Sequence, residues 1–309
     1  MVSAMIQSVR QQIVFLVLAA VVALATFAGG LWWFGRWHDE WSGYNASSMI
    51  GDGYCNVAVI PVEGDIGFFG KDTDDGSQVA DADDVVSMIH QAESEPGILG
   101  ILVRIDSPGG TPVASRVIAD ALRRSSVPVA AVIREKGTSG GYLAATGANV
   151  IFADPMSDVG SIGVTESYVD NVEKNRRDGL IYVSLASAKY KDSGDPNKPL
   201  TQDERALLER DLKIVHEQLI KLVAENRKLP LEDVAKLADG SSMPGTLALE
   251  SKLIDVLGDQ ETARSWLAKR LGLSTAAVRY CPVVTIDHVR HHKDRPEGAV
   301  KKTGAAVPE

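Results

Sequence analysis

The sequence predicts an α/β domain built from parallel βαβ units, preceded by one N-terminal transmembrane helix. The first prediction comes from short apolar segments that alternate along the chain with segments of helical pattern. These apolar segments lack strict alternation of apolar and polar residues, which is typical of strands in a parallel sheet covered on both faces. The second prediction comes from residues 13–34, a run of 22 uncharged and mostly apolar residues.

The apolar run is long enough for a membrane anchor. A helix of 22 residues is about 33 Å long, which is enough to cross the hydrocarbon core of a bilayer. Tryptophans cluster at its far end, as at a membrane interface, and Arg10 before it favours a cytoplasmic N-terminus. The run is longer than the apolar part of an ordinary signal peptide, so we expect an uncleaved, single-pass anchor in the cell (inner or cytoplasmic) membrane. The acidic remainder would then be extracytoplasmic.

The expected organisation has four parts. Residues 1–37 form a cytoplasmic stub and the anchor, residues 38–54 a linker, residues 55–286 the folded domain, and residues 287–309 a polar, disordered tail. In the folded domain we expect strands at 56–62, 98–105, 127–133, 150–153, 162–165 and 180–185. We expect helices at 83–95, 111–124, 142–147, 168–177 and 201–228.

Local signals support the boundaries of these elements. Pro96 and Gly97 end the first helix, and glycine-rich turns follow the strands at 98–105 and 127–133. Thr201 and Glu204 have the spacing of a capping box at the start of the longest helix. An apolar stripe along that helix should be buried, either in the core or in a subunit interface. The stripe comprises Leu208, Leu212, Val215, Leu219 and Leu222.

Composition excludes several classes of function. The net charge of −9 makes binding to a phosphate backbone unfavourable. Two cysteines, Cys55 and Cys281, are too few for a disulfide-rich scaffold or a cysteine zinc cluster. They could form one disulfide outside the cytoplasm or remain as two buried thiols. No His-Glu-x-x-His pair is present, which excludes a zincin.

Two glycine-rich turns carry the candidate chemistry. Each follows an apolar strand and precedes a helix, so its backbone N–H groups could hold a phosphate or the oxyanion of a tetrahedral intermediate. The second turn, Gly137-x-Ser139-x-Gly141, matches the nucleophile-elbow pattern. The alternative is that Ser139 only caps the following helix.

A nucleophilic serine needs a base, and the histidines are poorly placed to supply it. Three of them lie in the polar tail, and His216 lies among charged residues of the long helix. A lysine with a depressed pKa is the other common base. Lys189, Lys191 and Lys198 share a loop before the long helix, although composition alone suggests that each is solvated.

Four motifs in order resemble the signal peptide peptidase A family (peptidase family S49, protease IV), in its short, membrane-anchored, single-domain form. They are Ser107-Pro-Gly-Gly110, Thr138-Ser-Gly-Gly-Tyr142, Gly160-Ser-Ile-Gly-Val164 and Tyr190-Lys-Asp192. The segment 238–255 fits the family less closely, since Pro244-Gly245 replaces the usual Thr-Gly. The resemblance covers roughly residues 56–260 and implies a ClpP/crotonase-like fold.

The resemblance also implies a serine peptidase mechanism with a Ser–Lys dyad. Ser139 would be the nucleophile and Lys191 the general base, and backbone amides of Gly109, Gly110 and Gly140 would form the oxyanion hole. Ser161 and Tyr142 would support the site. No metal or cofactor is expected. In this family the serine and lysine come from different catalytic domains, so the chain should form a homo-oligomer. The implied substrates are remnant signal peptides and other apolar peptides at the membrane.

Two other functions remain open at this stage. One is a membrane-anchored α/β-hydrolase esterase with a Ser-His-Asp triad, which would need a histidine near Ser139. The other is a membrane assembly scaffold that keeps the fold without catalysis.

Overall fold

The structure, a computed structural model, describes residues 55–68 and 79–282. All of them belong to one compact unit of the chain, Ile50–Glu309. The predicted anchor, the whole of the predicted linker and the tail lie outside the described residues. Among the residues that are described, no helix is both long and apolar enough to cross a membrane.

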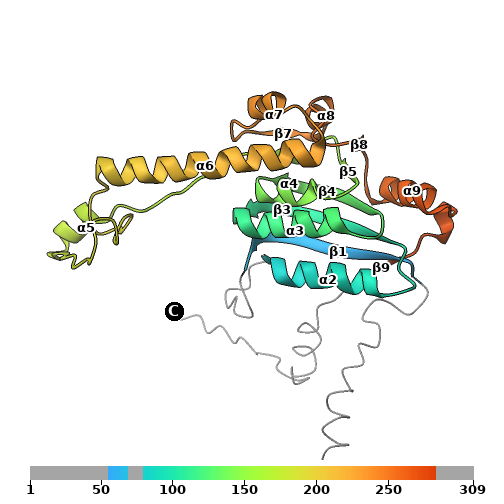
Figure 1. Ribbon diagram of the computed structural model, residues 1–309, viewed down its shortest axis with the longest axis horizontal. Coiled ribbons are helices and arrows are strands. Elements are labelled where there is room, and N and C mark those ends of the chain that lie inside the picture. Colours follow the sequence, from blue (N-terminus) through green and yellow to red (C-terminus); the bar gives the residue numbers. More distant parts are fainter. Residues whose placement is uncertain (1–54, 69–78, 283–309) are drawn as a thin grey trace, which may run out of the picture. The chain divides into compact units, whose positions relative to one another are not determined.

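A nine-stranded sheet organises the described residues (Figure 1). Its main path runs β2 (Val79–Asp81), β1 (Val57–Gly67), β3 (Gly100–Gly110), β4 (Val129–Thr138), β5 (Val150–Ala153) and β8 (Val256–Leu257). Every neighbouring pair on this path is parallel, as predicted. β9 (Tyr280–Pro282) pairs with β1, and β6 (Asp158–Gly160) continues the sheet beside the end of β4. The one antiparallel pair in the described sheet joins β6 to β7 (Ser242–Pro244).

Both faces of the sheet are covered, which explains the apolar strands without strict alternation. Along β1, Ala58 and Ile60 face a core shared with α2 (Ala82–Ser94), α3 (Pro112–Arg124) and α4 (Gly140–Ala145). Val57 and Val59 face the opposite core, which is closed by α9 (Gln260–Leu271). The described fold also contains three short elements: α7 (Leu231–Leu237), α8 (Gly245–Glu250) and the 3-10 turn Thr275–Ala277.

The long helix α6 (Gln202–Arg227) has the predicted capping box. Thr201 Oγ1 accepts the Glu204 N–H at 3.3 Å, and the Glu204 carboxylate accepts the Thr201 N–H at 2.9 Å. The apolar stripe is buried only in part. Leu219 packs into the core, whereas Val215, one turn earlier in the middle of the helix, is 37% exposed. The core of this chain therefore covers only part of the stripe, and burial of the rest in a subunit interface stays a prediction.

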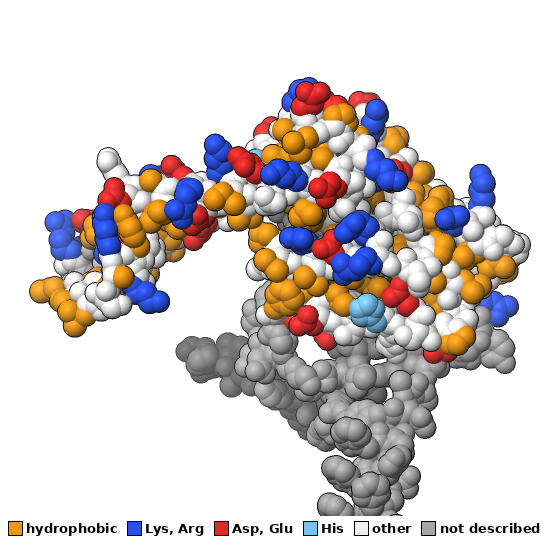
Figure 2. Space-filling view, viewed as in Figure 1, with side chains coloured by type: hydrophobic (Ala, Val, Ile, Leu, Met, Phe, Trp, Pro, Cys, Tyr) orange, Lys and Arg blue, Asp and Glu red, His pale blue; other side chains and the backbone are white. Residues whose placement is uncertain are grey.

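The segment between β6 and α6 departs most from prediction. No strand is formed at 162–165 or 180–185, and the helix predicted at 168–177 is reduced to α5 (Val172–Arg177). Figure 2 shows exposed apolar side chains, in orange, at the left of the view, where Figure 1 labels α5. Ile181 is 88% exposed and Leu185 is 96% exposed. Within the described part of this unit no sheet edge pairs with residues 180–185, so their apolar pattern finds no partner there.

The two cysteines form a disulfide. Cys55 precedes β1 and Cys281 lies in β9, and their Cα atoms are 5.5 Å apart. The bridge therefore joins the two ends of the described domain beside the pairing of β1 with β9. This settles the choice between a disulfide and two thiols that composition left open.

Candidate active site

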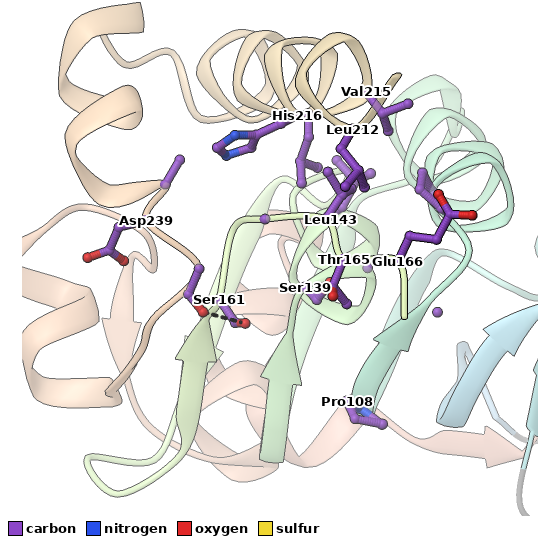
Figure 3. A pocket seen from close by; sticks show the side chains of 18 of the residues that line it. Pro108, Ser139, Leu143, Ser161, Thr165, Glu166, Leu212, Val215, His216 and Asp239 are labelled. Carbon is purple, nitrogen blue, oxygen red and sulfur yellow. Dashed lines mark hydrogen bonds between the residues drawn. The ribbon is translucent and has the colours of Figure 1, made fainter. Parts of the chain in front are cut away.

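Ser139 lines a cavity of 910 Å³ between the glycine-rich turns and α6 (Figure 3). One wall consists of the turns after β3 and β4, and a second consists of residues 161–166 with Ala238, Asp239 and Gly240. The remaining wall is the face of α6 that carries Asp211, Leu212, Val215, His216 and Leu219. The cavity thus combines a candidate nucleophile with apolar surface, as a peptide-binding site would.

The backbone at Ser139 is strained. Its φ of 51° and ψ of −120° are unusual for a residue with a side chain and cost about 1–3 kcal/mol. The conformation is held on both sides, because the Ser139 N–H donates to Gly160 O at 2.7 Å and Ser139 O accepts the Leu143 N–H at 3.0 Å. This sharp strand-to-helix turn presents Ser139 to the cavity, as in a nucleophile elbow.

Gly110 and Gly140 form a tight backbone cradle beside Ser139. A Cβ on Gly110 would lie 1.9 Å from Ile66 O, and a Cβ on Gly140 would lie 2.2 Å from Ser115 Oγ. The latter position would also be 3.1 Å from the backbone nitrogen of Gly110, so the two glycines lie side by side. Gly140 is the first residue of α4, where a backbone N–H has no partner within its own helix. The cradle can therefore direct N–H groups toward a developing oxyanion.

Gly109 has a different role from its neighbour. Its N–H donates to Ser107 Oγ at 3.1 Å, and that hydroxyl donates to Gly64 O at 2.6 Å. A Cβ on Gly109 would lie 2.8 Å from Ser139 Cβ. Gly109 therefore lets the turn approach Ser139 closely, while its amide is engaged in holding the turn.

Ser161 and Tyr142 occupy different places around the site. Ser161 lines the cavity, has a φ of 50°, and donates its hydroxyl to Gly240 O at 3.0 Å (Figure 3). Tyr142 is fully buried behind the turn and donates its hydroxyl to Leu253 O at 2.8 Å. Burial raises the pKa of Tyr142 well above its ordinary value. Tyr142 thus anchors α4 to the core and does not line the cavity.

Lys191 is not a wall of this cavity. It is exposed in the loop between α5 and α6, and no lysine is among the described residues that line the cavity. Within the described residues, the Ser139 hydroxyl has no hydrogen-bond partner that could act as its base. Within one chain, Ser139 therefore lines the cavity, whereas Lys191 lies outside it in an exposed loop.

The three lysines of that loop differ in their partners. Lys189 pairs with Asp203 at 2.7 Å, and this hydrogen bond raises the pKa of Lys189. Lys198 pairs with Glu204 and with Asp192, and its pKa is raised mainly by the hydrogen bond to Glu204. Both are held in the charged form that cannot accept a proton. Among the described ion pairs none involves Lys191.

His216 is the site residue that the sequence did not reveal. It lies on the α6 wall, and its buried Nε2 has no hydrogen-bond partner in the described structure. Its place one residue after Val215 in the apolar stripe was the available signal. Its neighbours Lys213, Glu217 and Lys221 on the same helix are charged, and they made a buried place for His216 look unfavourable.

Comparison with known proteins identifies the family. Residues 121–274, which include Ser139 and Lys191, match the family model of peptidase family S49. The chain belongs to peptidase family S49.

Similar S49 proteins come from bacteria and plants. Protease 4 of Salmonella typhi is 30% identical over 219 residues, which cover 68% of this chain and 32% of that protein. The chloroplastic serine protease SPPA of Arabidopsis thaliana is 27% identical over 180 residues, or 57% and 27% of the two chains. A protein of Enterococcus faecium named as a candidate signal peptide peptidase is 26% identical over 196 residues, or 62% and 57%. The chain spans less than two thirds of the length of each of these relatives.

Proposed function

We propose that the protein is a membrane-anchored serine endopeptidase with a Ser139–Lys191 dyad. The observation that carries the proposal is Ser139 itself, strained at a strand-to-helix turn and exposed to a cavity beside a glycine cradle. Membership of family S49 supports it, and so do relatives named as proteases. The α/β sheet is consistent with the ClpP/crotonase-like fold that we infer for residues 55–286.

The proposed reaction is acyl transfer in two steps. Neutral Lys191 accepts the Ser139 hydroxyl proton as the serine oxygen attacks a peptide carbonyl, and N–H groups of Gly110 and Gly140 stabilise the oxyanion. Lys191 then gives the proton to the leaving amine as the C–N bond breaks. Water, deprotonated by Lys191, hydrolyses the acyl-enzyme and restores Ser139.

We propose that Lys191 acts on Ser139 of a neighbouring copy in a homo-oligomer. Three features of the loop support this arrangement: Lys191 is exposed, it is outside its own chain's cavity, and it lacks an ion-pair partner among the described residues. The same segment exposes Ile181 and Leu185, which a second copy could cover. Covering this surface would also desolvate Lys191, which lowers the pKa of an amine and makes it a base.

The proposed substrates are remnant signal peptides and other apolar peptides at the membrane. Leu212, Val215 and Leu219 on the α6 wall of the cavity give such peptides an apolar surface, although Asp211 and His216 line the same wall. Residues 13–34 would anchor the enzyme in the membrane that holds these peptides, with the catalytic domain on its extracytoplasmic side.

A serine-directed fluorophosphonate probe tests the proposal. Wild-type protein should be labelled and should hydrolyse an apolar peptide, whereas Ser139→Ala should do neither. Lys191→Ala should lose hydrolysis but retain the oligomer, because we assign the contact between copies to the exposed apolar side chains of this segment, such as Ile181 and Leu185, and not to Lys191. Labelling of Ser139→Ala at the wild-type level would contradict the assignment of the nucleophile.

A further inference from the structure

The loop that carries Lys191 is tied to the first turn of α6 through the next residue, Asp192 (Figure 1). Lys198 Nζ lies 3.3 Å from Asp192 Oδ1 and also binds the Glu204 carboxylate. Glu204 is buried in the capping box of α6, where its carboxylate accepts the Thr201 N–H. Lys198 therefore bridges the residue beside Lys191 to an anchored carboxylate of the long helix.

A second contact fixes the same Asp192 carboxylate. The Ser184 hydroxyl donates to Asp192 Oδ2, whereas Lys198 binds Oδ1, so both carboxylate oxygens have a partner. The hydrogen bond from Ser184 lowers the pKa of Asp192, which keeps the carboxylate ionised and attractive to the Lys198 ammonium. The side chains of Asp192 and Lys198 are each only 21% exposed, so salt screens their attraction less than that of a fully exposed pair.

The Lys191 side chain has no comparable support. It is exposed, and among the described residues it forms no ion pair. Its backbone N–H donates to Ala188 O at 3.1 Å, which closes only a local turn. The direction in which Lys191 projects therefore follows the backbone of this turn, and the contacts of Asp192 fix that backbone to α6.

We propose that Lys198 is a positioning residue: by binding Asp192 and Glu204 together, it holds Lys191 in the direction needed to reach Ser139 of a neighbouring copy. The proposal rests on the proposed function, in which Lys191 is the base. A misplacement of about 1 Å can cost about 10²-fold in rate, so loss of this bridge should slow the chemical step. Lys198 does not line its own chain's cavity, so substrate binding should change little.

Steady-state hydrolysis of an apolar peptide by full-length variants tests the proposal. Lys198→Met, which removes the ammonium, should lower kcat about tenfold to a hundredfold and leave KM within about twofold of wild type. Lys198→Arg should restore most of kcat, because a guanidinium can bind both carboxylates. Ser184→Ala, an exposed substitution that should not impair folding, should lower kcat by a smaller factor.

Lys174→Met is the matched control. Lys174 on α5 pairs with Asp178 at 2.9 Å, so this substitution removes the same charge and one ion pair. Neither residue forms an ion pair with Asp192 in the part of the chain that the structure describes. The kcat of Lys174→Met should equal that of wild type. Thermal melting and crosslinking verify that each variant is folded and oligomeric.

Wild-type kcat in Lys198→Met, with Lys191→Ala inactive, would overturn this proposal alone. Equal loss of kcat in Lys198→Met and Lys198→Arg would also overturn it, because the bridging charge would then not matter. A raised KM at unchanged kcat would do the same, since it indicates a contact with substrate. If Lys198→Met does not fold, wild-type kcat in Ser184→Ala would overturn the proposal. An inactive wild type, or full activity of Lys191→Ala, would refute the proposed function itself.

Discussion

Reduction of the Cys55–Cys281 disulfide should greatly destabilise the folded domain. The two cysteines are 226 residues apart, so the bridge closes almost the whole domain into one loop. The loss of loop-closure entropy in the unfolded chain gives about 5 kcal/mol of stabilisation for a loop of this length. The bridge should matter because β9, which contains Cys281, has only three residues with which to hold its place beside β1.

Equilibrium unfolding in guanidinium chloride, followed by circular dichroism, measures this effect. Full-length protein is compared before and after reduction, so that both samples contain the same side chains. The double variant Cys55→Ala/Cys281→Ala is the control, and its stability should not respond to reductant. Alkylation of the unfolded, unreduced wild type should detect no free thiol. A free energy of unfolding that reduction leaves unchanged would refute the reasoning.

Two further predictions concern side chains around the site. Tyr142→Phe should lower the free energy of unfolding by about 1–3 kcal/mol in chemical denaturation, because Leu253 O loses a buried donor; unchanged stability would contradict this. Hydrogen bonding to Lys198 lowers the pKa of Glu204 from its ordinary 4.5 to about 2. The stability that wild type has over Glu204→Gln should therefore be complete above about pH 4.5 and vanish as the pH falls toward 2, measured by thermal melting. A pH-independent difference would show that Glu204 ionisation is not involved.

Periodicity was sufficient to predict most of the sheet domain from the sequence. β5 occupies the predicted residues, and α2 and α3 agree with prediction within one residue at each end. These elements are buried on the side that their apolar spacing indicates, so local pattern and tertiary packing agree. β3 and β4 run further than predicted, through or up to the glycine-rich turns, because tertiary pairing with neighbouring strands overrides weak local propensity.

The segment from 161 to 200 could not be predicted in the same way. The apolar residues at 180–185 have the composition of a strand, but a strand needs a partner, and the described sheet offers none there. His216 was missed because the pattern of α6 shows which face is apolar but not that this face lines a cavity. By contrast, Ser139 was predictable because its turn combines glycine spacing with a preceding strand and a following helix.

Mixing two inactive variants tests the central claim, a dyad shared between copies. Ser139→Ala and Lys191→Ala chains are co-assembled, and hydrolysis of an apolar peptide is measured against each variant alone. If each site takes its serine and lysine from different chains, random mixing in equal amounts should restore about a quarter of wild-type activity. Crosslinking verifies that mixed oligomers form. Mixed oligomers that remain inactive, while wild type treated in the same way stays active, would contradict the shared dyad.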